Sequence, residues 1–176
     1  MGLRPIGPMR GVKKGKIIWL TGNSEAGKST ISRHLYYTCE RIIILDGDRM
    51  RETIARELRF TKDDREILNI RIAKLAGYLA TMDYDVIVAS MCPYQDIRDK
   101  VVEVLDVQFQ QTCKWVYLRR DGIAKNIARA VAHPYFPPEN PDLYFNTRET
   151  TLEYELDTII DTFGLTRKKK DADKKL

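Results

Sequence analysis

The sequence predicts an α/β fold: a parallel five-stranded sheet with helices on both faces. Short apolar runs alternate with longer segments of helical period along most of the 176 residues. The apolar runs lack polar alternation, which is typical of strands buried on both faces. Strands that alternate with helices over this length favour parallel strands joined by crossover helices.

Five short runs have the composition expected of strands. Each is rich in Ile, Val, Leu or aromatic residues, and polar or turn residues follow it. Because the carboxyl ends of parallel strands meet at one edge of the sheet, we expect the ligand to bind at that edge. The runs cover residues 16–21, 41–46, 85–90, 114–118 and 143–146.

Segments of helical period separate these runs. The longest extends over residues 62–82, where four apolar residues (Leu68, Ile72, Leu75 and Leu79) recur on one helical face. This stripe predicts a helix that packs against the sheet. Helices are expected over residues 28–40, 62–82, 98–105, a short segment ending near 131, and 150–163.

The segment between the first strand and the first helix has the form G-x-x-x-x-G-K-S. Its glycines let backbone N–H groups surround a phosphate, and the helix N-terminus attracts the same anion. The lysine can reach the β- and γ-phosphates, and the serine hydroxyl can ligate Mg²⁺. We therefore predict a P-loop NTPase-type fold that binds ATP and Mg²⁺. The predicted nucleotide-binding residues are Gly22, Asn23, Ser24, Glu25, Ala26, Gly27, Lys28, Ser29 and Thr30.

Small-molecule kinases, GTPase switches and ATPase motors all use such a loop. A GTPase needs an N/T-K-x-D motif after a late strand, whereas T-K-D-D at residues 61–64 occurs early and fits a capped helix start better. A motor usually ends a strand with an acid for Mg²⁺, but the run 85–90 ends in Ala89-Ser90. The sequence therefore favours a kinase, although it does not exclude GTP as the donor.

Two carboxylates, Asp46 and Asp48, follow the second strand. A carboxylate there can orient Mg²⁺-bound water or accept the proton of an attacking hydroxyl. An Asp-Gly turn that caps a helix explains the pattern equally well. Arginines expected near the same edge favour an anionic acceptor, although a surface ion pair explains any single one more simply. These arginines are Arg51, Arg65, Arg71 and Arg98.

From about residue 16 to residue 163, the sequence resembles the adenylylsulfate kinase family, whose members phosphorylate the 3′-hydroxyl of adenosine 5′-phosphosulfate. The most specific markers are L-D-G-D-x-x-R at 45–51 and P-E-N-P-D-L at 138–143. Further markers are L-R-F at 58–60, D-R-E at 64–66, C-P-Y at 92–94 with Arg98, and R-D at 120–121.

The resemblance implies a role for each matching residue. Lys28 and Asp48 would be catalytic, and Ser29 and Asp48 would hold Mg²⁺. Arg129 would contact the donor nucleotide. Phe60 would stack on the acceptor base, while Arg51 and Arg65 would hold the acceptor's sulfate or phosphate. The implied acceptor-binding residues are Asp46, Asp48, Arg51, Phe60, Arg65, Asn69, Pro93 and Tyr94.

The chain departs from the family pattern on the acceptor side. The Lys-Gly-Leu-Tyr segment expected after Asp121 is replaced by residues 122–126, and the lid's Phe-Thr-Gly segment is missing before residue 133. Asn69 is displaced by one position from the family's Asn, and Cys92 stands where a Ser is usual. A different anionic or nucleotide-linked acceptor therefore stays an alternative, as does a non-kinase nucleotide-binding switch.

Length and composition predict one domain. Hydrophobic residues make up 43% of the chain, and part of the excess of 30 Lys and Arg over 25 Asp and Glu lies near its ends. We expect a flexible basic extension over residues 1–15, a P-loop kinase domain over 16–164 and a charged disordered tail over 165–176. Three cysteines without C-x-x-C spacing argue against a disulfide framework.

No segment has the apolar length of a signal-peptide core or a membrane span. We expect a cytoplasmic protein whose partner is a small anionic acceptor, without nucleic-acid or membrane contacts. The sequence does not report the oligomeric state and leaves a homodimer open.

Overall fold

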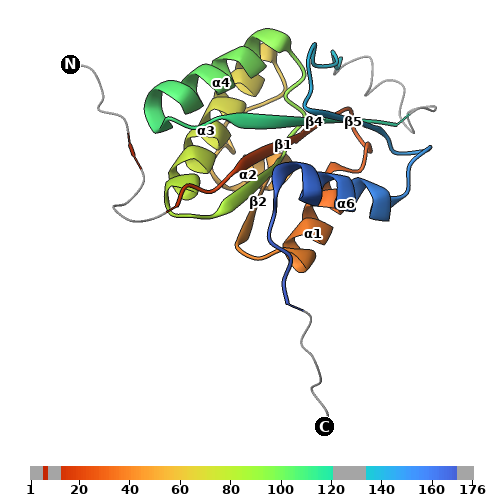
Figure 1. The fold of residues 1–176 in the computed structure, drawn as a ribbon. Helices are drawn as coiled ribbons and strands as arrows, with labels where there is room; N and C mark the ends of the chain where they lie inside the picture. Colours follow the sequence, from red (N-terminus) through yellow and green to blue (C-terminus); the bar gives the residue numbers. More distant parts are fainter. Residues whose placement is uncertain (1–5, 8–12, 121–133, 170–176) are drawn as a thin grey trace.

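The computed structural model describes residues 6–7, 13–120 and 134–169 (Figure 1). Within them, five parallel strands form one sheet in the order β2-β3-β1-β4-β5, so the predicted fold class is confirmed. The strands are β1 (Ile17–Thr21), β2 (Ile42–Asp46), β3 (Asp85–Ala89), β4 (Cys113–Arg119) and β5 (Leu143–Asn146). The helices are α1 (Lys28–Thr38), α2 (Gly47–Thr53), α3 (Lys62–Thr81), α4 (Gln95–Phe109) and α6 (Leu152–Phe163).

Helices cover both faces of the sheet. Successive residues of a strand point to opposite faces, so Ile17 and Trp19 pack with α3 and α4, while Ile18 and Leu20 pack with α1 and α6. All four side chains are at most 1% exposed. Because apolar layers cover both faces of the sheet, the strand sequences are continuous apolar runs without polar alternation.

The central strand β1 fixes the position of the phosphate loop. It pairs with β3 on one side and β4 on the other, with Leu20 opposite Ala89 and Thr21 opposite Tyr117. The loop leaves the end of β1, so it emerges between the ends of the two neighbouring strands. This is the edge at which α/β sheets bind ligands.

Two helices differ from the sequence-based expectation. Residues 47–53 form α2, for which the sequence indicated an Asp-Gly cap but no helical range, because a helix of seven residues is too short to show a period. Helix α4 extends over 95–109 rather than 98–105, and it begins directly after the Pro93-Tyr94 pair. The predicted short helix ending near residue 131 lies outside the described residues.

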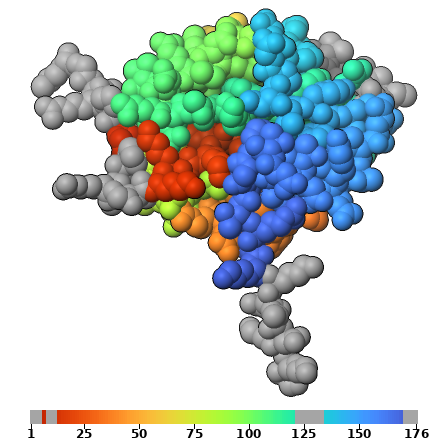
Figure 2. Space-filling view, viewed as in Figure 1, coloured from red at the N-terminus to blue at the C-terminus, as the bar shows by residue number. Residues whose placement is uncertain are grey.

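The packed part of the chain extends beyond Gly164, the predicted end of the kinase domain. Leu165 is buried, and the backbone N–H of Lys168 donates to the carbonyl of Thr38 at the end of α1. Cys39 and Arg167 form an isolated antiparallel bridge. In Figure 2 this last described segment, in dark blue, lies against the orange surface of α1. The burial of Leu165 holds the beginning of the segment that composition alone predicted to be a disordered tail.

Within the described ranges, no helix combines the length and apolar character needed to cross a membrane. The three cysteines are free thiols, as expected.

Candidate functional site

The phosphate loop has the backbone shape that its sequence predicts. Gly27 is the residue before α1 and has φ 96°, a left-handed conformation that favours glycine. Gly22 has φ 154° and passes close to β4: a Cβ there would lie 2.1 Å from the carbonyl oxygen of Leu118. Both glycines are therefore required by the path of the loop.

The acidic residue of the loop points away from the others. Glu25 is exposed and has φ 65°, and its carbonyl accepts a hydrogen bond from the Arg120 guanidinium at 3.4 Å. Asn23 and Ser24 are exposed beside it, whereas Ala26 is buried under the loop. The exposed position keeps the Glu25 carboxylate in water.

Lys28 lies folded over the loop. Its Nζ donates to the carbonyl oxygens of Gly22 at 2.8 Å and Asn23 at 2.7 Å. Burial lowers the pKa of this amine from 10.5 to about 8, although Asp48 and Asp46 oppose the shift. The lysine is thus held next to the phosphate position by carbonyl groups that a phosphate can replace.

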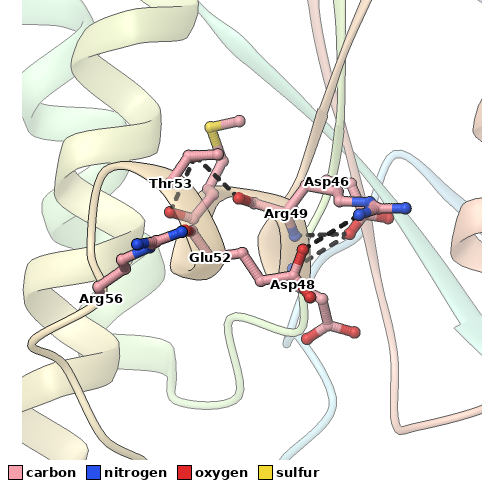
Figure 3. Close-up of polar contacts among 7 residues, drawn as sticks. Asp46, Asp48, Arg49, Glu52, Thr53 and Arg56 are labelled. Atoms are coloured by element: carbon pink, nitrogen blue, oxygen red, sulfur yellow. Dashed lines mark hydrogen bonds and ion pairs between the residues drawn. The ribbon is translucent and has the colours of Figure 1, made fainter.

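The Asp46 carboxylate joins the loop to α2. One of its oxygens accepts a hydrogen bond from the Ser29 hydroxyl at 2.7 Å. The other accepts from the backbone N–H groups of Asp48 and Arg49, which caps α2 (Figure 3). The sequence left open whether this Asp-Gly pattern served a cap or a site; Asp46 is a cap that also contacts the loop.

These oxygen atoms fit a magnesium ion. Mg²⁺ prefers oxygen ligands, usually one or two carboxylates together with substrate phosphates and water. Ser29 and Asp46 supply a hydroxyl and a carboxylate side by side at the loop. No cluster of three or more acidic, His or Cys side chains that could hold a metal occurs among the described residues.

The charge of Asp48 acts on two cations that come from different elements. Its exposed carboxylate interacts electrostatically with Lys28 of the loop and with Arg51, one turn further along α2. It also lines a hollow of about 550 Å³ with Arg51 and Phe60. Asp48 is therefore the acid that faces both the phosphate loop and the hollow.

Two residues that line the hollow were missed by sequence reasoning, Glu52 and Arg56. Arg56 Nε donates to the Glu52 carbonyl, and the Glu52 carboxylate pairs with Arg49 at 3.1 Å (Figure 3). Glu52 lies on α2 and Arg56 three residues after its end, so both follow Arg51 closely, which becomes visible once α2 is recognised.

Arg51 and Arg65 flank the ring of Phe60. Their guanidinium carbons lie 4.6 Å and 5.8 Å from its centroid. Arg51 donates to the carbonyls of Leu58 and Arg59, and Arg65 donates to the carbonyl of Phe60. These carbonyl contacts leave both guanidinium groups near the Phe60 ring, with Asp48 and Asp64 acting on Arg51 electrostatically.

Burial lowers the pKa of both guanidinium groups, and for Arg65 the nearby charge of Arg51 lowers it further. Two neighbouring like charges that repel each other favour an anionic ligand. Asp64 and Asp48 oppose the shift only at Arg51.

The other two candidate arginines have different roles. Arg71 pairs with Glu57 and also donates to the carbonyl of Ile54, which is the surface ion pair considered above. Arg98 is 2% exposed and donates to backbone carbonyls, including Cys92 at 2.7 Å and Phe136 at 3.1 Å. The structure therefore directs neither residue toward an acceptor.

Asn69 is not available to a ligand in this conformation. Its side chain is buried, donates to the carbonyl of Arg65 at 2.7 Å and accepts from Ser90 at 2.9 Å. Pro93 is also buried, whereas Tyr94 is half-buried with Lys62 over its ring at 5.2 Å. Asn69 thus holds the backbone beneath Arg65.

Arg129, predicted to contact the donor, lies outside the described residues. The remaining predicted residues occupy one edge of the sheet: the loop at 22–30, Asp46 and Asp48, Arg51, Phe60 and Arg65, and Pro93 and Tyr94.

Comparisons with known proteins agree with this geometry. The model of the adenylylsulphate kinase family matches residues 14–146. An adenylyl-sulfate kinase from Deinococcus deserti is 36% identical, covering 88% of this chain and 94% of the relative. One from Myxococcus xanthus is 34% identical, covering 86% and 92%.

A solved structure shows the same fold. The APS kinase of Mycobacterium tuberculosis in complex with AMPPNP and APS has a TM-score of 0.74 at 24% identity, covering 86% of this chain and 99% of that chain. The family model and the relatives cover most of the chain, including the phosphate loop, α2 and the Arg65 segment. The chain therefore belongs to the adenylylsulphate kinase family.

Proposed function

We propose that this protein transfers the γ-phosphoryl group of ATP to the 3′-hydroxyl of adenosine 5′-phosphosulfate (APS), giving 3′-phosphoadenosine 5′-phosphosulfate. The position of Asp48 in the hollow beside Arg51 and Phe60, with its charge acting on Lys28 of the phosphate loop, carries the proposal, because it puts one carboxylate near both the loop and the arginines. Family membership supports this choice of acceptor, since the relatives from Deinococcus deserti and Myxococcus xanthus are adenylyl-sulfate kinases.

The donor side binds and orients the triphosphate. The backbone N–H groups of residues 22–30 surround the phosphates, and Lys28 moves from its carbonyl partners to the β- and γ-phosphate oxygens. Ser29, with Asp46 beside it, would hold Mg²⁺, which when bound neutralises phosphate charge.

Asp48 serves the acceptor hydroxyl. As the 3′-oxygen attacks the γ-phosphorus, the bond from phosphorus to the β,γ-bridging oxygen breaks, and the hydroxyl proton passes to the Asp48 carboxylate. Lys28 stays beside the transferred group and offsets its negative charge. The exposed position of Asp48 in the hollow allows the hydroxyl to reach it.

The acceptor occupies the hollow that Asp48, Arg51 and Phe60 line. Arg51 and Arg65 bind its phosphosulfate group, because both are cationic, flank the Phe60 ring and donate to backbone carbonyls. The Phe60 ring, 48% exposed, stacks on the base.

We predict that ATP binding takes up a proton above pH 8. In the free protein the pKa of Lys28 is about 8, so its amine is neutral in most molecules at pH 8.5. Bound phosphates favour the charged amine. ATP affinity should therefore fall as the pH rises through 8. Calorimetric titration with Mg-ATP at pH 8.5, in two buffers of different ionisation enthalpy, measures the uptake.

The matched control is Lys28→Arg, since a guanidinium remains charged at this pH. Its ATP binding should show no uptake. Equal uptake in the variant and the native protein would mean that another group titrates.

We predict that Asp48→Asn lowers kcat by about 10²–10⁴-fold, the usual contribution of a general base. ATP affinity should change little, because the variant leaves Lys28 and the loop intact. The measurement is ADP formation with and without APS, together with equilibrium binding of ATP. The native protein should form ADP fast only when APS is present.

The control is Glu52→Gln. Glu52 lines the same hollow, but its carboxylate already pairs with Arg49. Its kcat should stay near the native value. A kcat of Asp48→Asn within a few-fold of the native value would contradict the role of Asp48. ADP formation by the native protein at the same rate with and without APS would favour a nucleotide switch.

We predict that Arg51→Met raises the KM for APS by about 10- to 150-fold, because a hydrogen bond to a charged group contributes about 1.5–3 kcal/mol. The KM for ATP should change little. Arg71→Met is the matched control, since Arg71 is already paired with Glu57 at the surface. Equal effects of the two substitutions on the KM for APS would argue against the arginine pair as the anion site.

A further inference from the structure

The two residues that follow β3 are fixed to the central strand of the sheet. Ser90 is buried and Met91 is half-buried. The Trp19 indole N–H of β1 donates to the Ser90 carbonyl at 3.2 Å, and the Thr21 hydroxyl at the end of β1 donates to the Met91 carbonyl. The backbone of both residues is therefore held by the strand from which the phosphate loop leaves.

The side chains of the same two residues contact α3. The Ser90 hydroxyl donates to the side-chain carbonyl of Asn69 at 2.9 Å, and Arg65 Nη1 lies 3.6 Å from the Met91 sulfur. Asn69 also donates to the Arg65 carbonyl, one turn earlier in the helix, at 2.7 Å. Two successive buried hydrogen bonds therefore link Ser90 to the backbone of Arg65.

Ser90 also lies against the first residue of α2. A Cβ at Gly47 would lie 2.9 Å from the Ser90 hydroxyl oxygen and 3.2 Å from the Ser90 Cβ, so α2 approaches Ser90 as closely as a glycine allows. Gly47 lies between Asp46, the cap that contacts the phosphate loop, and Asp48. Ser90 therefore contacts both helices that carry acceptor-side residues, α2 and α3.

We propose that Ser90 is a positioning residue for acceptor binding, which holds Arg65 in place relative to α2 through its hydrogen bond to Asn69. This inference rests on the proposed function, in which Arg65 binds the anionic group of the acceptor. Binding of a phosphate or sulfate by a guanidinium depends on geometry, so a small displacement of the first turns of α3 weakens it. The phosphate loop leaves β1 and contacts Asp46, so ATP binding does not depend on the link to Asn69.

The test separates positioning from folding stability by changing the same hydrogen bond in two ways. Ser90→Ala leaves the buried Asn69 carbonyl without its donor, which lowers stability, whereas Ser90→Ala combined with Asn69→Leu removes both partners and regains stability. In both proteins we expect the KM for APS to rise about 3- to 10-fold, the usual contribution of one hydrogen bond. The KM for ATP should stay within twofold of the native value, and the Tm of each protein reports its stability.

The matched control is Thr81→Val, which removes a buried hydroxyl at the other end of α3, where it donates to the Tyr78 carbonyl at 2.6 Å. Its KM for APS should stay at the native value whatever its Tm. A second comparison uses Arg65→Met as the starting protein. Adding Ser90→Ala to it should change the KM for APS by less than twofold, because Ser90 acts through the missing guanidinium.

With the native protein active on APS, a native KM for APS in the double variant would overturn this inference alone, since the hydrogen bond would then serve stability only. The double variant decides the question by itself if Ser90→Ala does not fold. An equal effect of Ser90→Ala with and without Arg65 would also overturn the inference. Native protein whose ADP formation does not respond to APS would overturn the proposed function and this inference together.

Discussion

The Asp46 carboxylate is the interaction on which the site depends. One oxygen accepts a hydrogen bond from the Ser29 hydroxyl of the phosphate loop. The other accepts hydrogen bonds from backbone N–H groups in the first turn of α2. Because α2 carries Asp48 and Arg51, this single side chain sets where these two residues lie relative to the phosphate loop. The loop itself is placed by β1, the central and fully buried strand.

The donor side could be predicted from the sequence because its signals are local. The glycine spacing of residues 22–27 determines a backbone shape, and the apolar run before it determines a buried strand. The acceptor side depends on contacts between distant segments. Tertiary packing decides whether an arginine contacts a ligand, a carboxylate or a carbonyl. The position of an arginine in the sequence therefore could not predict the different partners of Arg51, Arg71 and Arg98.

Short elements and buried polar groups account for the other differences. Helix α2 has seven residues, too few for a periodic stripe. Asn69, displaced by one from the family position, turns inward to Ser90 instead of toward a ligand. Leu165 packs against the core, although the residues after it are mostly charged. For Asn69 and Leu165, a contact with a residue distant in the sequence outweighs the local composition.

The most direct test is the identity of the product formed from Mg-ATP and APS by the purified protein. Mass spectrometry, with comparison to authentic 3′-phosphoadenosine 5′-phosphosulfate, establishes both the added phosphoryl group and its position. We predict one 3′-phosphorylated product for each ADP released. Release of ADP and inorganic phosphate, with APS unchanged, would contradict the transfer of the phosphoryl group from ATP to APS.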